Sequence, residues 1–389
     1  MPACLSWIRG PQKGTAIVAR RILYLSKGGN IGGSHRQLLL LLKGLDASYE
    51  PTVVCTTEGQ IVDQLRSAGI RTEVLSLRPW RKPRHVVHRY RDAERLVAFA
   101  RSIAPACLHA SDMWLGNYVN WLRWRLPVPS IVHVRGPVTW RGIWKHRLYA
   151  ATGLISISPK ITRVLRSAYI RADRIVQIEG AVDVDSFRPS KNRLAELSGC
   201  PGDGPVLCIG LVGRIEPAKR QLEFIRTALE VRRRWGRQVR FVLVGEVRDR
   251  AYGAEVNRLA QTGDLNGQLV LLGRRDDMPD VLNSLDVLVS LSGGSVMYEA
   301  MSCGLCVVSA GFTKPGESIH LRDGETGIVT PTADPRVLAA ILGDLIEHPD
   351  TRRRLGDAAR SWAVRELSHT RIAAQTTAFY DRVLAKRAL

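Results

Sequence analysis

The sequence lacks the features of a secreted, membrane-spanning or disordered protein. Its 389 residues hold only 7 cysteines, an odd number scattered mostly through apolar runs, which predicts reduced, buried thiols in a cytosolic protein. No window approaches the ~18 consecutive apolar residues of a membrane-spanning helix. The first twenty residues have no apolar stretch of signal-peptide length. We therefore expect a cytoplasmic, folded protein whose contact with a membrane can only be peripheral.

One cysteine pair, Cys303 and Cys306, has the C-x-x-C spacing found in metal and redox sites. No second pair follows at zinc-finger spacing, and no redox-type context surrounds the motif. Two interpretations stay open, namely buried structural thiols, which the apolar neighbourhood favours, and a metal or redox site.

Acidic residues are scarce in the first half of the chain. The whole sequence has 57 Lys+Arg against 36 Asp+Glu, a net charge of +21. Residues 1–188 hold 29 Lys+Arg and 12 Asp+Glu, which leaves +17 there and +4 in residues 189–389. Such asymmetry is typical of a chain whose first half meets a strongly anionic partner. The basic residues are densest at Arg78, Arg81, Lys82, Arg84, Arg89, Arg91 and Arg95, and where Arg alternates with Trp from Trp121 to Arg147.

Short β-rich runs alternate with helical patterns, which predicts two doubly wound α/β domains, each Rossmann-like, with a cleft between them. A Gly- and Pro-rich stretch divides the two series. We place an acceptor-side domain at 1–188, a linker at 189–205 and a second domain at 206–369, with a final helix over 370–389 that packs back on the first domain. The expected strands are 21–26, 52–56, 71–77, 106–110, 130–134, 153–157, 174–178, 206–212, 239–244, 269–272, 286–290 and 305–309; the expected helices include 34–45, 61–68, 218–235, 295–302, 335–347, 350–366 and 370–384.

Two glycine-containing loops follow predicted strands and lead into helices. The run 28–34 ends in Gly33 and Ser34, and the run 292–295 ends in Ser295, each at the start of a helix. Glycine lets a phosphate approach the backbone, and the amino end of a helix adds partial positive charge. A tight structural turn explains the first loop equally well, because the spacing is not that of dinucleotide-binding proteins.

Several charged or titratable residues occupy positions where a ligand would bind. Arg214 and Lys219 flank a turn after a strand and could clamp a diphosphate, or they could be solvated surface cations. Glu299 lies in an otherwise apolar helix, so it needs a partner, either a ribose diol or an internal arginine. His109 and His133 each end a strand, and a structural role is open for both.

Together these residues resemble the family 4 glycosyltransferases with the GT-B fold. The resemblance rests on the strand ending in Val-Gly-Arg with Lys219 following, on the run from Glu299 to Gly304, and on Asp323-Gly324-Glu325-Thr326-Gly327. The segments 178–189, 32–36 and 333–389 are similar to the family's interdomain signature, first loop and closing helices. The motifs occur in the family's order over nearly the whole chain.

The resemblance implies a role for each site residue. Arg214 and Lys219 would hold the nucleotide diphosphate, Ser295 and Glu299 would bind the donor, with Glu299 on its ribose, and Gly33 would let the backbone approach the transferred group. His133 would be the catalytic histidine near the transferred sugar, with His109 and Arg135 on the acceptor side. The resemblance implies an enzyme that retains anomeric configuration and needs no metal or cofactor, in keeping with the absence of a D-x-D-type metal motif where a donor would bind.

One departure from the family pattern concerns the donor sugar. The family has a second glutamate eight residues before the ribose glutamate, where this sequence has Leu291, or Gly293 if the loop is shorter. Cys306, and the segment 312–317 in place of the usual glycine-proline-glutamate, are smaller departures.

The resemblance and the charge distribution lead to a hypothesis about function. We expect a hexosyltransferase that uses a UDP- or GDP-linked sugar and a lipid-linked or glycan acceptor at the cytoplasmic face of an anionic membrane, which the first domain contacts with its Arg and Trp residues. The alternative is that these tryptophans are core residues and the arginines a solvated face, in which case the first domain does not contact a membrane through them. Alternatives are a soluble small-molecule acceptor and an inactive nucleotide-binding protein. A nucleic-acid-binding protein is disfavoured, because recognition motifs and a basic tail are missing.

Overall fold

The computed structural model describes residues 19–80, 86–191, 194, 206–236, 239–261, 265, 267–310 and 320–386. The chain divides into two compact units, and each is described by itself. Unit 1 comprises the residues up to Ala181 together with those from His369 onward, and unit 2 comprises Val182–Ser368. The sequence-based boundaries stand at residues 188 and 369, and most of the expected linker 189–205 lies outside the described residues.

Unit 1 is built on a sheet of parallel strands in the order β3-β2-β1-β4-β5-β6-β7. The order runs outward from β1 in both directions, so ligands are expected beyond the carboxyl ends of the strands near β1. The strands are β1 Arg20–Ser26, β2 Tyr49–Cys55, β3 Arg71–Val74, β4 Cys107–Ala110, β5 Ser130–Val134, β6 Gly153–Ser156 and β7 Ile175–Gln177.

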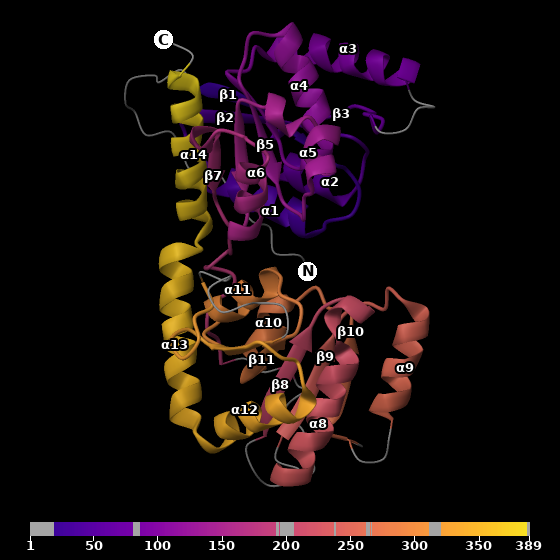
Figure 1. The fold of residues 1–389 in the computed structure, drawn as a ribbon, viewed down its shortest axis with the longest axis vertical. Coiled ribbons are helices and arrows are strands. Elements are labelled where there is room, and N and C mark those ends of the chain that lie inside the picture. The colour runs from indigo at the N-terminus through magenta and orange to yellow at the C-terminus, as the bar shows by residue number, and fades with distance from the viewer. Residues whose placement is uncertain are drawn as a thin grey trace. The chain divides into compact units, whose positions relative to one another are not determined.

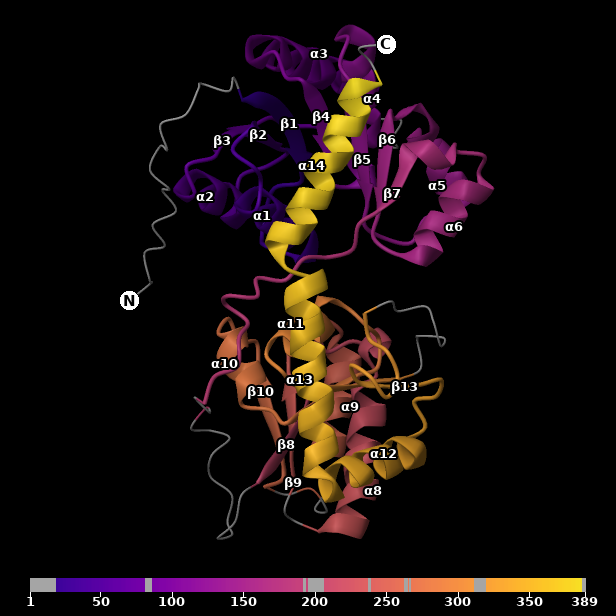
Figure 2. The same ribbon diagram turned by 90° about the vertical axis from the view of Figure 1, so that its left-hand side faces the viewer.

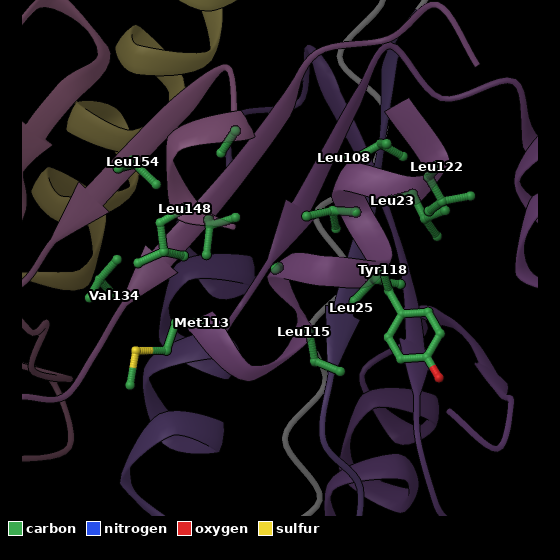
Figure 3. Packing of buried hydrophobic residues seen from close by; sticks show 14 of the residues in the cluster. Leu23, Leu25, Leu108, Met113, Leu115, Tyr118, Leu122, Val134, Leu148 and Leu154 are labelled. Atoms are coloured by element: carbon green, nitrogen blue, oxygen red, sulfur yellow. The ribbon is translucent and has the colours of Figure 1, made fainter. Parts of the chain in front are cut away.

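Alternate residues of β1 enter two different core clusters, as the period of two in a strand requires. Leu23 and Leu25 pack on the face that α3 and α4 cover, whereas Ile22 and Tyr24 pack on the face that α1 and α14 cover. Figure 3 shows the first of these clusters, with Tyr118 directing its hydroxyl away from the labelled leucines. The helices of unit 1 are α1 Gly33–Lys43, α2 Gln60–Ser67, α3 Val86–Ile103, α4 Gly116–Arg125, α5 Trp140–Lys145, α6 Pro159–Ser167 and α14 His369–Ala385, with short 3-10 turns η2 Met113–Leu115, η3 Leu148–Ala150 and η4 Ala172–Arg174.

The last helix of the chain belongs to unit 1, although its sequence lies far from the rest of that unit. It packs against α1, and it is the yellow helix along unit 1 in Figure 2. Phe379 and Tyr380 of α14 are buried in the same cluster as Tyr24 of β1. The helix therefore completes one layer of unit 1.

Unit 2 is also built on a sheet of parallel strands, in the order β10-β9-β8-β11-β12-β13, of which Figure 1 labels β8 to β11. One face is covered by α8 and α12, and α11 and α13 pack together over the other. Its elements are β8 Leu207–Val212, the 3-10 turn η5 Pro217–Lys219, α8 Gln221–Trp235, β9 Val239–Val244, α9 Arg250–Ala260, β10 Leu269–Gly273, α10 Met278–Asn283, β11 Val287–Ser290, α11 Ser295–Ser302, β12 Cys306–Ala310, β13 Ile328–Thr330, α12 Pro335–Glu347 and α13 Pro349–Glu366.

The predicted pair of Rossmann-like α/β domains is confirmed, with differences at the ends of elements: the strand expected to reach Leu77 ends at Val74, and the helix expected to reach Leu45 ends at Lys43. The helix expected from Ala218 begins only at Gln221, because Arg220 adopts the left-handed region with φ 57° after the 3-10 turn Pro217–Lys219. The sequence pattern does not predict β13, since three residues are too few to display alternation. Among the described residues, no helix is both long and apolar enough to cross a membrane.

Candidate functional site

The glycine loop before α1 combines positions that the fold requires to be glycine with positions that it leaves open. A Cβ at Gly28 would lie 1.7 Å from the carbonyl oxygen of Thr57, and Gly29 has φ 92°. At Gly32 and at Gly33, the first residue of α1, a Cβ would meet nothing within 4 Å. The start of the loop is therefore a tight structural turn, while its end leaves room for a ligand at the amino end of α1. The predicted role of Gly33 stays a prediction.

The two predicted histidines lie beside each other on one face of the unit 1 sheet. His109 in β4 and His133 in β5 are both buried, and their rings stack with centroids 5.7 Å apart. Burial, reinforced by the charge of Arg135, lowers the pKa of His109 to about 3. Burial, with Arg135 and His109 as further causes, lowers the pKa of His133 well below its ordinary value. Both rings are therefore neutral near pH 7.

Arg135 determines which nitrogen of His133 carries the proton. Its Nη2 donates to Nδ1 of His133 at 3.1 Å, and its Nε donates to the carbonyl oxygen of Ser111 at 3.1 Å. Because a nitrogen that accepts a hydrogen bond carries no proton, the neutral ring of His133 has its proton on Nε2. That buried Nε2 has no hydrogen-bond partner among the described residues. His133 can thus donate one hydrogen bond to a ligand oxygen.

His109 is held by the last helix of the chain. Its Nδ1 lies 2.6 Å from Oη of Tyr380, which lies 3.0 Å from Oη of Tyr24. This chain of contacts ties β1, β4 and α14 together, which gives His109 a structural function. Its predicted place on the acceptor side stays a prediction, as does that of Arg135.

The tryptophans of unit 1 divide between core and surface. Trp121 packs against the core cluster beside Trp80 and Tyr90, as the core interpretation expects. Trp124 is 80% exposed, and Trp144 is 63% exposed. The core interpretation therefore holds for Trp121, and the surface interpretation holds for Trp124 and Trp144.

Four exposed aromatic side chains form what we call the aromatic–basic surface. Trp140 contacts Tyr169, and Trp144 contacts Tyr149 with ring centroids 4.8 Å apart. Exposed cations of the same α5–η3 segment accompany them: Arg141, Lys145 and Arg147. From Met113 to Ala172 the sequence has ten Lys+Arg and no Asp or Glu. The surface thus joins indole rings to positive charge that no carboxylate of this stretch offsets.

In unit 2, Lys219 lies at the amino end of α11. A Cβ at Gly294, the residue before that helix, would lie 3.9 Å from Nζ of Lys219, and the lysine stem passes Gly213, whose Cβ would lie 3.3 Å from Cδ. Burial, offset by Glu216 and reinforced by Arg214, lowers the pKa of the half-buried Lys219. An ammonium beside a helix amino end makes a positive environment suited to an anion.

Arg214 is more exposed than Lys219 and already has a partner. Its Nη2 donates to Oε1 of Glu216 at 2.9 Å, and 56% of its side chain is exposed. The alternative of a solvated surface cation therefore describes Arg214 better than Lys219. Its predicted contact with a diphosphate requires it to leave or share Glu216.

The segment around α11 holds the remaining predicted donor residues. Gly293 and Gly294 have φ 69° and 118°, so glycine is required there by the backbone. Ser295 is the exposed first residue of the helix, and Glu299 is buried one turn further on. Leu291 is buried in the core cluster of the α8 and α12 face, so its position presents no polar group to a ligand. The missing family glutamate is not replaced at that position.

The C-x-x-C cysteines are buried in unit 2. Cys303 caps the carboxyl end of α11, Cys306 opens β12, and both thiols are free. Burial raises the pKa of each thiol to about 12, which keeps both protonated. Among the described residues, neither belongs to a group of potential metal ligands. Buried structural thiols therefore explain the motif; Cys55, Cys107 and Cys208 are likewise free and buried, while Cys4 and Cys200 lie outside the described residues.

The predicted residues thus form two groups. Gly33, His109, His133 and Arg135 belong to unit 1, and Arg214, Lys219, Ser295 and Glu299 belong to unit 2. Within unit 1 the histidines and Arg135 are in contact; within unit 2 Lys219 meets the start of α11.

Sequence reasoning missed two buried polar residues next to these groups. Tyr380 bonds to His109, yet as one aromatic residue on an amphipathic helix it gives no sequence signal. His35 lies in the first turn of α1, and its buried Nε2 has no partner among the described residues. A histidine three residues after the helix cap of a glycine loop is a signal that could have identified His35.

Comparison with known families gives two matches. Residues 32–180 match the glycosyl transferase 4-like domain, and residues 207–348 match glycosyl transferases group 1. The first match lies in unit 1 and the second in unit 2, in the order that the motifs predict.

Two proteins with similar sequences are both named as glycosyltransferases. The D-inositol 3-phosphate glycosyltransferase of Streptomyces scabiei is 25% identical over 291 residues, covering 65% of this chain and 63% of that protein. The protein of the same name from Saccharomonospora viridis is 28% identical over 290 residues, covering 66% and 65%. The match thus spans less than two thirds of the length of these relatives.

A solved structure shares the fold. Anabaena HepE in complex with UDP and glucose superposes with a TM-score of 0.77 at 20% sequence identity, covering 92% of this chain and 98% of that chain. At this identity the likeness concerns the fold alone.

Proposed function

Because this chain belongs to the family 4 glycosyltransferases of the GT-B fold, we propose that it transfers a hexose from a nucleoside diphosphate sugar to an acceptor hydroxyl. The observation that carries the proposal is the half-buried ammonium of Lys219 beside the amino end of α11. Two sources of positive potential meet there, as the binding of a diphosphate requires. The UDP named with the HepE structure supports a nucleotide as the ligand.

The donor contacts are proposed residue by residue from the family pattern. Lys219 and Arg214 hold the diphosphate, Ser295 offers a hydroxyl and a backbone N–H at the helix start, and Glu299 accepts from the ribose hydroxyls. In unit 1 the end of the glycine loop at Gly33 admits the transferred sugar, and His133 donates from Nε2 to one of its oxygens. No resident cofactor or metal takes part in this scheme.

The proposed reaction breaks the bond between the anomeric carbon and the phosphate oxygen and forms a bond to the acceptor oxygen on the same face of the sugar. The acceptor proton passes to the leaving diphosphate, whose developing charge Lys219 and Arg214 stabilise. The anomeric configuration is retained. The neutral His133 holds the sugar and neither takes nor gives a proton.

The donor half of the proposal is tested by thermal shift of the whole chain with UDP, GDP and their glucose conjugates. A ligand at one hundred times its Kd stabilises the folded state by about 2.7 kcal/mol, which moves the midpoint of unfolding by several degrees. We expect a shift with one nucleotide diphosphate series. The absence of a shift with all of them would contradict the proposed donor.

We further propose that the acceptor is lipid-linked or part of a growing glycan, at the cytoplasmic face of an anionic membrane. The aromatic–basic surface supports this, because indole rings favour the membrane interface and each nearby cation adds about 1 kcal/mol of attraction to anionic lipid. Trp140 and Trp144 lie one turn apart on α5 and both are exposed, so both can enter the interface together.

Co-sedimentation with vesicles tests the membrane contact. The chain should bind vesicles that contain anionic lipid at low salt, and should release them as the salt concentration rises. The double variant Trp140→Ala, Trp144→Ala should lose binding, whereas Leu271→Ala, an exposed apolar change in unit 2, should not. If the unchanged chain, the double variant and Leu271→Ala all bind the vesicles equally, or if none of them binds, the aromatic–basic surface is not a membrane contact.

A soluble acceptor is the second candidate. The names of the curated relatives describe transfer to D-inositol 3-phosphate, which is a small phosphorylated polyol. The absence of a carboxylate at Leu291 keeps a third possibility open, a nucleotide-binding chain without turnover. Release of free UDP or GDP from a sugar conjugate in the presence of acceptor excludes the third.

A further inference from the structure

Unit 1 contains a cavity of about 620 Å³ that none of the site residues predicted from the sequence lines. Its walls come from the segments that follow β1 to β4 and from the end of α5, so it opens at the carboxyl edge of the sheet. We call it the indole cavity, after Trp80 and Trp114 in its wall. The volume is that of a small-molecule site.

The indole cavity is lined by cations and by no carboxylate. Lys27, Arg78 and Lys145 line it, together with His146. Arg78 donates to the buried Asp92 at 3.1 Å, and Lys27 forms an ion pair with Asp112 at 3.5 Å. Lys145 forms no ion pair with any residue that the structure describes. The ammonium of Lys145 is therefore the charge that the ion pairs of the lining leave uncompensated, and it makes the cavity favourable to an anion.

The aromatic residues of the wall make contacts within the protein. The backbone N–H of Trp114 donates to Oδ1 of Asp112 at 3.0 Å, and the centroid of its ring lies 5.4 Å from Nζ of Lys27 and 4.6 Å from the ring of His146. Tyr118 donates from Oη to the carbonyl oxygen of Arg78 at 2.7 Å. Rigid aromatic faces next to cations suit a flat ring with an apolar face and an anionic substituent.

Small polar groups complete the wall. The hydroxyl-bearing residues Thr56, Thr57 and Ser76 line the cavity, and Asn117 donates to the carbonyl oxygen of Lys145 at 3.2 Å. Hydroxyl groups that both donate and accept are matched to the hydroxyls of a sugar rather than to a hydrocarbon. A bare alkyl chain could form no hydrogen bond with these side chains.

We propose that the indole cavity binds the acceptor of the transfer, and that this acceptor is a hydroxylated ring carrying a phosphate. The ring packs on Trp114, its hydroxyls meet the threonines and Ser76, and its phosphate lies between Lys27 and Lys145. The inference rests on the proposed function and names the substrate class of its acceptor half. The phosphate can belong to a free sugar phosphate or to a lipid-linked sugar, and Lys145 lies both in the cavity and on the aromatic–basic surface.

Calorimetric titration of the whole chain without donor tests the inference. The probes are glucose 1-phosphate, glucose 6-phosphate, glucose and inorganic phosphate, with glucose linked to farnesyl diphosphate as the lipid arm. At least one sugar phosphate should bind ten times more tightly than glucose and than inorganic phosphate, since one charge-assisted hydrogen bond provides about that factor. Tighter binding of the farnesyl conjugate identifies the lipid source, and its equal or weaker binding identifies the free one.

Variants locate the binding. Lys27→Gln, Lys145→Gln and Trp114→Ala should each weaken the sugar phosphate about tenfold or more. Lys160→Gln on α6 and Trp124→Ala on α4, which remove an exposed cation and an exposed indole that do not line the cavity, should leave the affinity unchanged. Equal affinity for glucose and both phosphates, or the same loss in the control variants, would overturn the inference.

A thermal shift with UDP on the same samples separates this inference from the proposed function. If UDP stabilises the chain and no sugar phosphate binds, the cavity assignment fails and the donor proposal stands. If a sugar phosphate binds through Lys27 and Lys145 while no nucleotide does, the cavity assignment stands and the proposed donor fails.

Discussion

Units 1 and 2 share one sheet order around their first strand but place different chemistry at the carboxyl edge. Unit 2 brings the ammonium of Lys219 to the start of α11, whereas unit 1 places two neutral histidines beside the half-buried Arg135. In unit 2 the cation comes from the turn that follows β8, whereas in unit 1 the histidines lie within β4 and β5 and Arg135 follows β5. The shared topology thus determines where a ligand can bind, and the residues at and after the strand ends determine which ligand it is.

The two units also differ in how far nearby acids compensate their cations. Cations of unit 2 are paired with nearby acids, as in Arg214 with Glu216 and Arg275 with Asp277. In unit 1 the stretch from Met113 to Ala172 holds ten Lys+Arg and no Asp or Glu of its own, and the acids that pair with its Arg125 and Arg171 lie outside it. The excess positive charge therefore lies in the unit that we assign to the acceptor.

Among these variants, replacing Lys219 should have the largest effect on activity. Lys219→Gln removes the ammonium from the proposed diphosphate site, and we expect kcat to fall by about 10² to 10³, as when one stabilising donor to a developing negative charge is lost. The matched control is Lys191→Gln, an exposed lysine in the same unit. Equal rates for the two variants in a product-formation assay would remove Lys219 from the site.

Replacing Arg135 in unit 1 should lower the rate less than replacing Lys219 does. Arg135→Met frees Nδ1 of His133, so the neutral ring can move its proton away from Nε2, and we expect kcat to fall about tenfold at unchanged donor KM. Arg135→Lys should restore part of the rate, because an ammonium also donates. His133→Gln, which keeps an N–H donor, should retain more activity than His133→Ala. Full activity of Arg135→Met at an unchanged melting temperature would show that the tautomer has no role.

The histidines of unit 1 also predict a dependence of stability on pH. The unfolded chain binds a proton on His109 near pH 6.5, whereas the folded chain binds it only near pH 3. The stability contribution is therefore complete above pH 6.5 and declines as the pH falls from there to 3. Between pH 7 and pH 5 the free energy of unfolding should drop by about 2 kcal/mol from His109, with a change of the same sign from His133.

Tryptophan fluorescence during urea unfolding measures this effect, because seven of the nine tryptophans belong to unit 1. His109→Gln should flatten the dependence between pH 7 and pH 5, and His348→Gln, an exposed histidine of unit 2, should leave it unchanged. A dependence that is equally steep in His109→Gln would show that other groups cause it.

Most of the fold follows from local sequence pattern. Apolar strands such as Val239–Val244 and capped helices such as Pro335–Glu347, where Asp334 accepts from two backbone N–H groups, carry their signal within a few residues. The start of α8 could not be predicted as well, because it depends on the left-handed conformation of Arg220, which only a glycine or asparagine would have signalled.

The candidate site was less accessible to sequence reasoning. Its residue types could be predicted from motifs, but the tautomer of His133 depends on Arg135, and the position of His109 depends on Tyr380, which is 271 residues away in the chain. The indole cavity could not be predicted at all, since its residues come from five separate segments. Contacts over such separations leave no trace in local periodicity.

The central claim is that unit 2 binds the nucleotide and unit 1 the acceptor. Hydrogen exchange of the whole chain with and without UDP tests this claim most directly. We predict that UDP slows exchange most strongly in two segments of unit 2, the turn 213–220 and the loop and helix 292–298, with lesser changes in unit 1 around residues 32–36. Strongest protection inside unit 1, or protection that persists undiminished in Lys219→Gln, would contradict the assignment of the nucleotide to unit 2.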